Sequence, residues 1–241
     1  MKEKLTAPAK LTLSLKITGR RPDGYHFIDA EMVSLDFSDQ ILITQGDGLE
    51  IKAAESGFTV DTGPENLVSR AMDLIGEKAF IHIDKKIPSG AGLGGGSTNA
   101  AAILRQFGFD DLTQASSIGA DVAYCLIGGR ARVSGIGEVI EPLPFLEKTF
   151  TLLIPPIGVP TPEIYKHWDE MGGPAGENGN DLEPALLSYM PEMIQYKKQL
   201  ASISGKQPQL AGSGGTWFVE GEFFNEDCRV VKTVPSNLHG K

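Results

Sequence analysis

The first regular pattern along the chain is an alternation of apolar and polar residues near the N-terminus. Apolar residues at positions 11, 13, 15 and 17 alternate with polar residues at 12, 14, 16 and 18. A period of two is typical of a half-buried β-strand. Such a strand places Lys10, Thr12 and Ser14 on one polar face, with the leucines turned towards the core. Residues 21–24, Arg-Pro-Asp-Gly, predict a turn after it.

The rest of the chain mixes predicted strands and helices without regular βα alternation, which favours an α+β fold. Proline residues and charges around position 145 predict a boundary between two domains, residues 1–145 and 146–241. We expect strands over 27–44 with a break near Ser38 and Asp39, over 80–87, 131–139 and 150–154, and before 220. We expect helices over 65–76, from about Ser97 to 106, and over 120–127, 162–170 and 182–202.

The composition bounds the kinds of partner that the protein binds. The 241 residues are 41% hydrophobic and 22% charged, which is ordinary for a globular protein. With 22 basic and 31 acidic residues, the net charge of −9 argues against nucleic-acid binding. Cys125 and Cys228 are too few for a disulfide framework or a zinc site, and indicate reduced cytosolic thiols. Without an apolar run of about 18 residues or a signal-peptide pattern, we expect a cytoplasmic protein with no membrane partner.

A glycine-rich loop carries the clearest chemical signal. Residues 90–95 match G-x-G-x-x-G, but no second strand with an acidic end follows, which argues against a Rossmann fold. No lysine follows the glycines, which excludes a Walker A loop. What remains is a strand, a glycine loop and a helix, an arrangement whose free N–H groups favour phosphate. The alternative is a flexible loop that ends in a Ser/Thr helix cap.

The loop and several other segments together resemble a known kinase superfamily. Residues 88–101 are similar to the phosphate loop of the GHMP small-molecule kinases. Within it, further matches resemble the branch that phosphorylates the 2-hydroxyl of a cytidine-diphosphate methylerythritol, in the non-mevalonate isoprenoid pathway. Those matches are residues 7–11, 21–26, 119–122, 160–165 and 180–184, and residues 210–214 resemble the third superfamily motif.

This resemblance implies a two-domain α+β GHMP kinase fold with the active site in the cleft between the domains. It implies Lys10 and Asp121 as the catalytic pair, and ATP and Mg²⁺ as cofactors, with Ser97 as the candidate metal ligand. It also implies a cytidine-diphosphate substrate, and we expect a monomer or weak homodimer. The implied ATP-binding residues are Pro88, Ser89, Gly90, Ala91, Gly92, Leu93, Gly94, Gly95, Gly96, Ser97 and Thr98; the implied substrate-binding residues are Thr12, Tyr25, His26, Pro162 and Tyr165.

Each of these residues also has a structural interpretation. A lone lysine at a strand start is usually solvated, and Asp121 is equally placed to cap a helix. Tyr165 on a helix is more often a packing residue than a stacking platform. Thr12 stands where the family usually has Asn, and the chain is shorter than is usual for the family. Substrate specificity is therefore the property in which we most expect this chain to differ from the family.

Three rival functions stay open from the sequence. A GHMP kinase for another small alcohol, such as mevalonate or homoserine, would lack the set Tyr25, His26 and Tyr165, and all three are present. A non-catalytic nucleotide-binding module would lack Lys10 or Asp121, and neither is lost. A structural protein with a glycine-rich hinge would show no saturable ATP binding.

Overall fold

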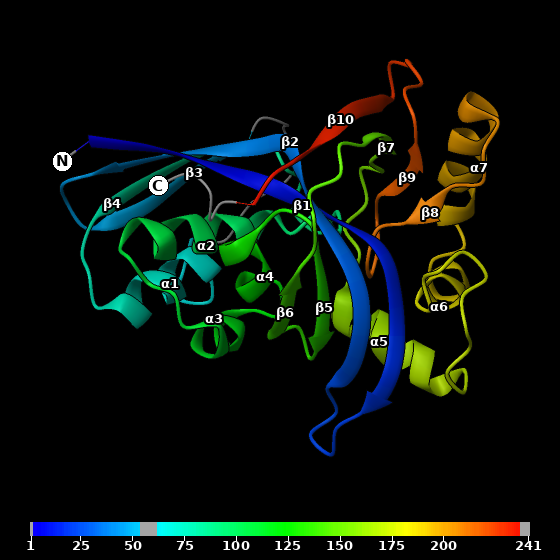
Figure 1. Cartoon of the computed structure of the whole chain (residues 1–241), viewed down its shortest axis with the longest axis horizontal. Coiled ribbons are helices and arrows are strands. Elements are labelled where there is room, and N and C mark those ends of the chain that lie inside the picture. The colour runs from blue at the N-terminus through cyan, green and yellow to red at the C-terminus, as the bar shows by residue number, and fades with distance from the viewer. Residues whose placement is uncertain (1, 54–61, 237–241) are drawn as a thin grey trace.

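Two long N-terminal strands organise the fold. The computed structural model describes residues 2–53 and 62–236. Strand β1 (Lys2–Arg20) pairs antiparallel with β2 (His26–Thr44), and a turn over the predicted residues joins them. In Figure 1 this blue hairpin runs from the N-terminal end of the molecule to helix α5 (Thr161–Glu170). The alternating pattern in the sequence therefore belongs to a strand that reaches across the molecule.

Strand β2 is the centre of the sheet. It pairs with β1, β4 (Phe80–Lys85), β5 (Ala131–Gly135) and β10 (Cys228–Val234). The path across the sheet is β3-β4-β2-β10-β7-β9-β8. The remaining strands are β3 (Gly48–Ala53), β6 (Val139–Pro142), β7 (Thr149–Leu153), β8 (Gln209–Leu210) and β9 (Trp217–Glu220). The predicted division near residue 145 stays a proposal, since β10 pairs with strands from both sides of it.

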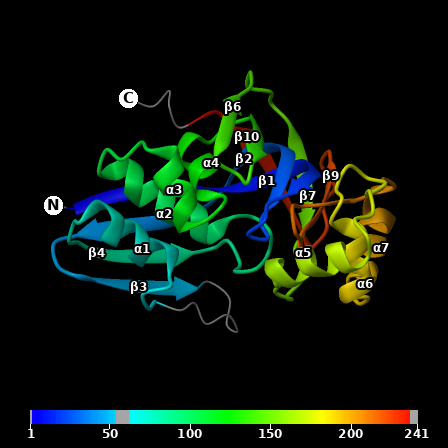
Figure 2. The same cartoon turned by 90° about the horizontal axis from the view of Figure 1, so that it is seen from below.

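The helices gather at the two ends of the sheet, as Figure 2 shows. One group consists of α1 (Leu67–Ile75), α2 (Gly95–Gln106), α3 (Leu112–Ile118) and α4 (Val122–Ile127). Its core is rich in alanine, which allows α2 and α4 to pack closely. The other group is α5 with α6 (Glu183–Tyr189) and α7 (Met193–Ser204), packed around Trp217. The helices and mixed sheet confirm the α+β class.

The predicted break in the second strand is wrong. β2 continues through Ser38 and Asp39, and the side chain of Asp39 is fully buried. The carboxylate is satisfied by the backbone N–H groups of Lys86 and Ile87 and by the side chains of Lys85 and Asn99. Asp39, one of two polar residues that look like a turn in the sequence, is thus a buried anchor beneath the end of β4.

Other boundaries differ from the predictions where glycine or proline lies. Helix α2 begins at Gly95 rather than near Ser97, after Gly94 in the left-handed region. The single strand predicted over 131–139 is the hairpin β5–β6, whose turn includes Gly137 with a positive φ. The helix predicted over 182–202 is two helices, because Pro191 interrupts it. Helix α3 and strands β3, β8 and β10 were not predicted.

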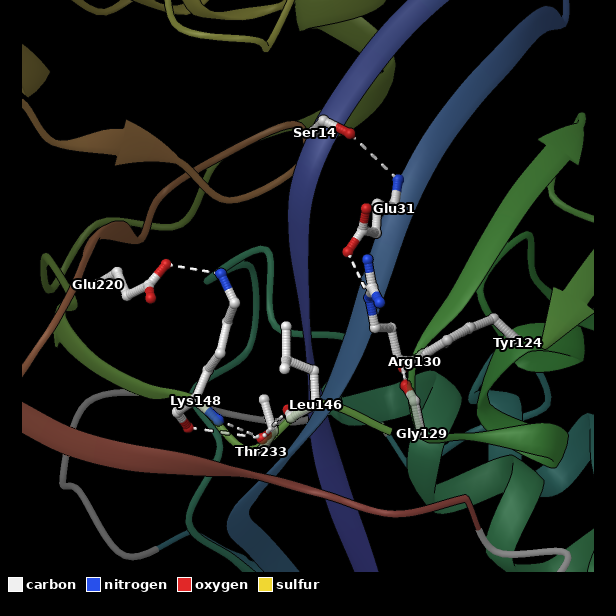
Figure 3. Close-up of polar contacts among 9 residues, drawn as sticks. All are labelled: Ser14, Glu31, Tyr124, Gly129, Arg130, Leu146, Lys148, Glu220 and Thr233. Carbon is white, nitrogen blue, oxygen red and sulfur yellow. Dashed lines mark hydrogen bonds and ion pairs between the residues drawn. The ribbon is translucent and has the colours of Figure 1, made fainter. Parts of the chain in front are cut away.

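Polar contacts hold the segment before β5 against β2, as Figure 3 shows. Arg130 donates to Glu31 on β2 at 2.8 Å. The hydroxyl of Tyr124 on α4 donates to the carbonyl of Gly129 at 2.6 Å. These contacts fix the C-terminal end of α4, and through it the start of that helix, against the central strand.

None of the helices in the described parts of the chain is long and apolar enough to cross a membrane.

Candidate active site

A cavity of about 1070 Å³ brings together residues from segments that lie far apart in the sequence. β1, the glycine loop, the start of α4, α5 and the turn at Gly212 all contribute to its wall. It therefore gathers nearly every residue that the resemblance singled out. The predicted residues on its wall are Lys10, Thr12, Tyr25, His26, Pro88, Ser89, Gly90, Ala91, Gly92, Leu93, Gly94, Gly95, Gly96, Ser97, Asp121, Pro162 and Tyr165.

Thr98 is the one predicted site residue that does not line this cavity. Its side chain is buried within α2, close to the thiol of Cys125 on α4. One residue past Ser97, the helix has turned the side chain towards the core. The hydroxyl of Thr98 thus belongs to the packing of α2 against α4.

Lys10 and Asp121 form an ion pair in the cavity, with Nζ 3.3 Å from Oδ2. The lysine is 5% exposed, so its ammonium is desolvated and held in one place. It also donates to the hydroxyl of Thr12 at 3.1 Å. The alternation in β1 explains this arrangement, since Lys10 and Thr12 emerge on the same face of the strand. That face is covered by the site rather than by solvent.

Asp121 does not cap its helix. It lies at the N-cap position of α4, but its side chain accepts no capping hydrogen bond. The carboxylate is instead about one-third exposed to the cavity and paired with Lys10. The two interpretations that the sequence left open are therefore distinguished by the direction of this side chain.

The glycine loop is fixed to the scaffold through its carbonyl groups. The carbonyl of Ala91 accepts from the N–H and the hydroxyl of Thr216, and that of Leu93 accepts from the N–H of Lys10. Gly92 has φ +75°, and a Cβ there would lie 2.3 Å from the carbonyl oxygen of Gly214. The loop is thus a built element that passes tightly beneath the Gly212–Gly215 turn, not a flexible linker.

The first turn of α2 offers N–H groups to the cavity. Gly95, Gly96 and Ser97 line the wall, and the first N–H groups of a helix have no partner within the helix. No side chain caps this end, and its first turn holds no acidic residue. The positive end of the helix dipole therefore faces the cavity, a fitting environment for phosphate.

A buried polar cluster supports the loop from below. The ammonium of Lys85 donates to Asp39 at 2.8 Å and to Asn99 at 3.1 Å, and all three residues are nearly inaccessible to solvent. A Cβ at Gly95 would lie 2.9 Å from the same ammonium. The cluster joins β2, the end of β4 and α2, so it sets where the loop begins and ends. Nothing in the sequence pattern identified it, because its members are isolated polar residues in apolar elements.

The opposite part of the cavity is lined by the hairpin turn and α5. The imidazole of His26 packs against the ring of Tyr165, with centroids 4.9 Å apart. Tyr25 is exposed on the same wall. Burial, with the negative charge of Asp121 adding to it, raises the pKa of the Tyr165 phenol, so this ring is neutral. The packing role and a site role of Tyr165 are thus combined, since the ring both contacts His26 and borders the cavity.

The sequence pattern did not identify Asp169 and Arg20, which also line this wall. Asp169 accepts from His26 Nε2 at 2.8 Å and pairs with Arg20 at 3.1 Å. Helical spacing would have found Asp169, because it lies four residues after Tyr165 on the same face of α5. Arg20 lies directly opposite His26 in the β1–β2 pairing.

The residues present fit nucleotide phosphates better than a metal held by protein alone. The described residues contain no group of three His, Cys, Asp or Glu that would hold a metal ion. The Ser97 hydroxyl and the Asp121 carboxylate are oxygen donors on the cavity wall. Mg²⁺ commonly binds through phosphates, waters and one or two protein oxygens, so this donor set fits an ion that arrives with a nucleotide.

Comparison with known proteins gives a consistent result. The family model described as GHMP kinases N terminal domain matches residues 66–129. A Paracoccus denitrificans (strain Pd 1222) protein named 4-diphosphocytidyl-2-C-methyl-D-erythritol kinase is 34% identical, over 88% of this chain and 84% of its own. A protein of the same name from Desulfitobacterium hafniense (strain Y51) is 37% identical with the same coverage.

Solved structures agree with these relatives. A crystal structure of 4-(cytidine 5'-diphospho)-2C-methyl-D-erythritol kinase superposes with a TM-score of 0.76 and 25% identity, over 96% of this chain and 99% of that one. Mevalonate pyrophosphate decarboxylase from Streptococcus pyogenes, at 11% identity and a TM-score of 0.65 over 98% and 97% of the two chains, shares the fold alone. The fold is therefore the GHMP kinase fold, and the chain belongs to the 4-diphosphocytidyl-2-C-methyl-D-erythritol kinase family.

Proposed function

We propose that this chain transfers the γ-phosphoryl group of ATP to the 2-hydroxyl of 4-diphosphocytidyl-2-C-methyl-D-erythritol. The observation that carries the proposal is the Lys10–Asp121 pair, which lies on the wall of the cavity that the glycine loop also lines. The relatives that share this name cover most of the chain.

The glycine loop would hold the nucleotide phosphates. Its segment from Pro88 to Ser97 borders the cavity, and the N-terminus of α2 contributes free N–H groups and a positive dipole. Mg²⁺ bound with ATP would neutralise charge on the phosphates, with the Ser97 hydroxyl as its proposed protein ligand. The side chain of Thr98 has no part in this proposal, since it is turned into the core.

Asp121 would orient the acceptor hydroxyl and receive its proton. Its pairing with Lys10 leaves part of the carboxylate open to the cavity. A carboxylate is a weak base towards an alcohol, so the proton is transferred late, as the new P–O bond forms and ADP departs. Most of the rate enhancement then comes from positioning and electrostatic stabilisation.

Lys10 would hold the acceptor oxygen and offset the negative charge on the transferred group. Its ammonium is desolvated and fixed by two partners, so its charge acts with little screening and without reorganisation. Thr12 fixes the position of the ammonium from within β1. This contact gives the residue that departs from the family pattern a role in placing the catalytic lysine.

The hairpin and α5 would bind the cytidine end of the substrate. Tyr25, His26, Pro162 and Tyr165 lie on one stretch of the wall, and a pyrimidine needs a flat surface and hydrogen-bonding partners for its edge. His26 is held by contacts to Tyr165 and Asp169, while Tyr25 is free to close over a ring.

The test is to incubate the protein with ATP, Mg²⁺ and the cytidine-diphosphate substrate and to measure ADP. Parallel reactions contain mevalonate or homoserine in place of that substrate. ADP release that depends on the cytidine-diphosphate substrate supports the proposal. Faster release with another alcohol indicates a kinase of different specificity, and nucleotide binding without turnover indicates a non-catalytic module.

A further inference from the structure

The imidazole of His26 has one nitrogen engaged and the other open. Nε2 lies 2.8 Å from Asp169 Oδ1. Nδ1 has no hydrogen-bond partner in the described structure, and it is not among the described buried atoms that lack one. Since His26 lines the cavity, the open nitrogen is reached from the cavity side.

The contact with Asp169 determines which nitrogen carries the proton. A carboxylate only accepts hydrogen bonds, so Nε2 must donate. The other oxygen of Asp169 pairs with Arg20 at 3.1 Å. With Nε2 as the donor, the ring in its neutral form carries its hydrogen on Nε2 and leaves a lone pair on Nδ1.

The plane of the ring is fixed as well. Tyr165 packs against one face of the imidazole at 30°, and Trp168 meets it edge-on with centroids 5.8 Å apart. Tyr165 and Asp169 are four residues apart on α5 and therefore lie on the same face of this helix. From that face Tyr165 fixes the orientation of the imidazole ring, and Asp169 accepts the hydrogen bond from Nε2. The side chain of His26 is only 7% exposed, which leaves it little freedom to flip.

We propose that Asp169 is a positioning residue that keeps His26 in the Nε2–H tautomer, so that Nδ1 accepts a hydrogen bond from the exocyclic amino group of cytosine. This inference rests on the proposed function, because it specifies how the cytidine end is distinguished. Cytosine carries an amino donor at the position where uracil carries a carbonyl acceptor. A fixed acceptor on the protein forms a hydrogen bond with the amino group of cytosine. Against the carbonyl of uracil, the same acceptor would leave two lone pairs facing each other.

The test replaces Asp169 with Asn and compares the binding of CDP and UDP by calorimetry, which requires no turnover. In Asp169→Asn the amide oxygen stays with Arg20, which only donates, so the NH2 group donates to Nε2 and moves the ring proton to Nδ1. We expect the wild-type protein to bind CDP about tenfold or more tightly than UDP, and Asp169→Asn to lose or reverse that preference. An unchanged preference overturns the proposal.

Glu170→Gln is the matched control. Glu170 is the next residue on α5 and pairs with His167 rather than His26, so removing its charge should leave the CDP preference intact. If Glu170→Gln lowers the preference as much as Asp169→Asn does, general charge explains the effect and the proposal fails.

The tautomer is observable directly in the wild-type protein, which keeps the proposal testable if Asp169→Asn does not fold. Long-range ¹H–¹⁵N correlation spectra distinguish the two tautomers and the doubly protonated ring. With four histidines in the chain, His26 is assigned by comparison with His26→Gln. Hydrogen on Nε2 alone is the expected result, and an Nδ1–H or doubly protonated ring contradicts the proposal. CDP preference and tautomer can stand even if no phosphoryl transfer is detected, so the two proposals fail separately.

Discussion

Lys10 Nζ and Asp121 Oδ2 lie 3.3 Å apart, although one residue is on β1 and the other begins α4. The glycine loop passes directly over the lysine, since a Cβ at Gly94 would lie 2.7 Å from Lys10 Cγ. The backbone N–H of the same lysine donates to Leu93. The loop and the ion pair are therefore one packed unit, and the position of either constrains the other.

Replacing Asp121 with Asn should lower turnover about 10²–10⁴-fold, because the variant cannot accept the hydroxyl proton. ATP affinity should change little, since the phosphates would be held by backbone groups of the loop. ADP release at saturating substrate, together with a nucleotide titration, measures both effects. Asp47→Asn, at an exposed carboxylate paired with Lys78, is the control. Turnover equal to that of the wild type would remove Asp121 from the mechanism.

Replacing Gly92 with Ala should destabilise the protein and weaken nucleotide binding together. The new Cβ would lie 2.3 Å from Gly214 O and 2.6 Å from Ala211 O, at a backbone φ of +75°. Two tight contacts with carbonyl oxygens force the loop away from the turn beneath which it passes. Thermal unfolding and ATP titration report the two effects.

Gly96→Ala is the informative comparison for that variant. Gly96 is helical, and its added Cβ would meet only Leu67, at an ordinary 3.5 Å. Stability should stay level or rise by about 0.5–1 kcal/mol, because Ala favours a helix over Gly. A loss of ATP binding in this stable variant would indicate close approach of a phosphate to the backbone. Equal stability of the Gly92 and Gly96 variants would contradict the tight packing of the loop.

Replacing Asp39 with Asn should cost about 3–5 kcal/mol of unfolding free energy, because it leaves the ammonium of Lys85 buried without its counter-charge. The carboxylate accepts four hydrogen bonds, and an amide provides a single acceptor oxygen. Urea denaturation of Asp39→Asn and of the exposed Asp47→Asn gives the comparison, with less than about 1 kcal/mol expected for the latter. Similar midpoints for the two variants would show that the buried cluster contributes little.

The two cysteines should differ in reactivity. Burial raises the pKa of the Cys125 thiol to about 12, so at pH 8 it stays protonated and covered. Burial also raises the pKa of Cys228, but that thiol is partly accessible. Alkylation followed by peptide mass analysis should therefore label Cys228 first, with Cys125 reacting only on unfolding. Early labelling of Cys125 would show that α4 opens in the native state.

The sequence predicted most of the elements whose signals are local. The alternation around Leu11 and the glycine loop depend on residues a few positions apart. The motifs that resemble those of the GHMP kinases also identified most residues of the candidate site. Each motif is a run of neighbouring residues, so the sequence alone shows the motifs and the order in which they occur. The failures were Ser38–Asp39, taken as a break, the two turns that divided predicted continuous elements, and the elements that were not predicted, which are β3, α3, β8 and β10.

The tertiary structure decided everything that depends on which distant residues meet. From the sequence, Asp121 was equally a helix cap, and only its contact with Lys10 settles where its carboxylate points. Asp39, Lys85 and Asn99 come from three elements and meet in one buried cluster. Asp169 on α5 contacts His26, which begins the second strand of the hairpin. A propensity or a motif records the neighbours of a residue along the chain. The protonation, burial and direction of a polar side chain are set by neighbours in space, and these exist once the sheet has paired and the helices have packed against it.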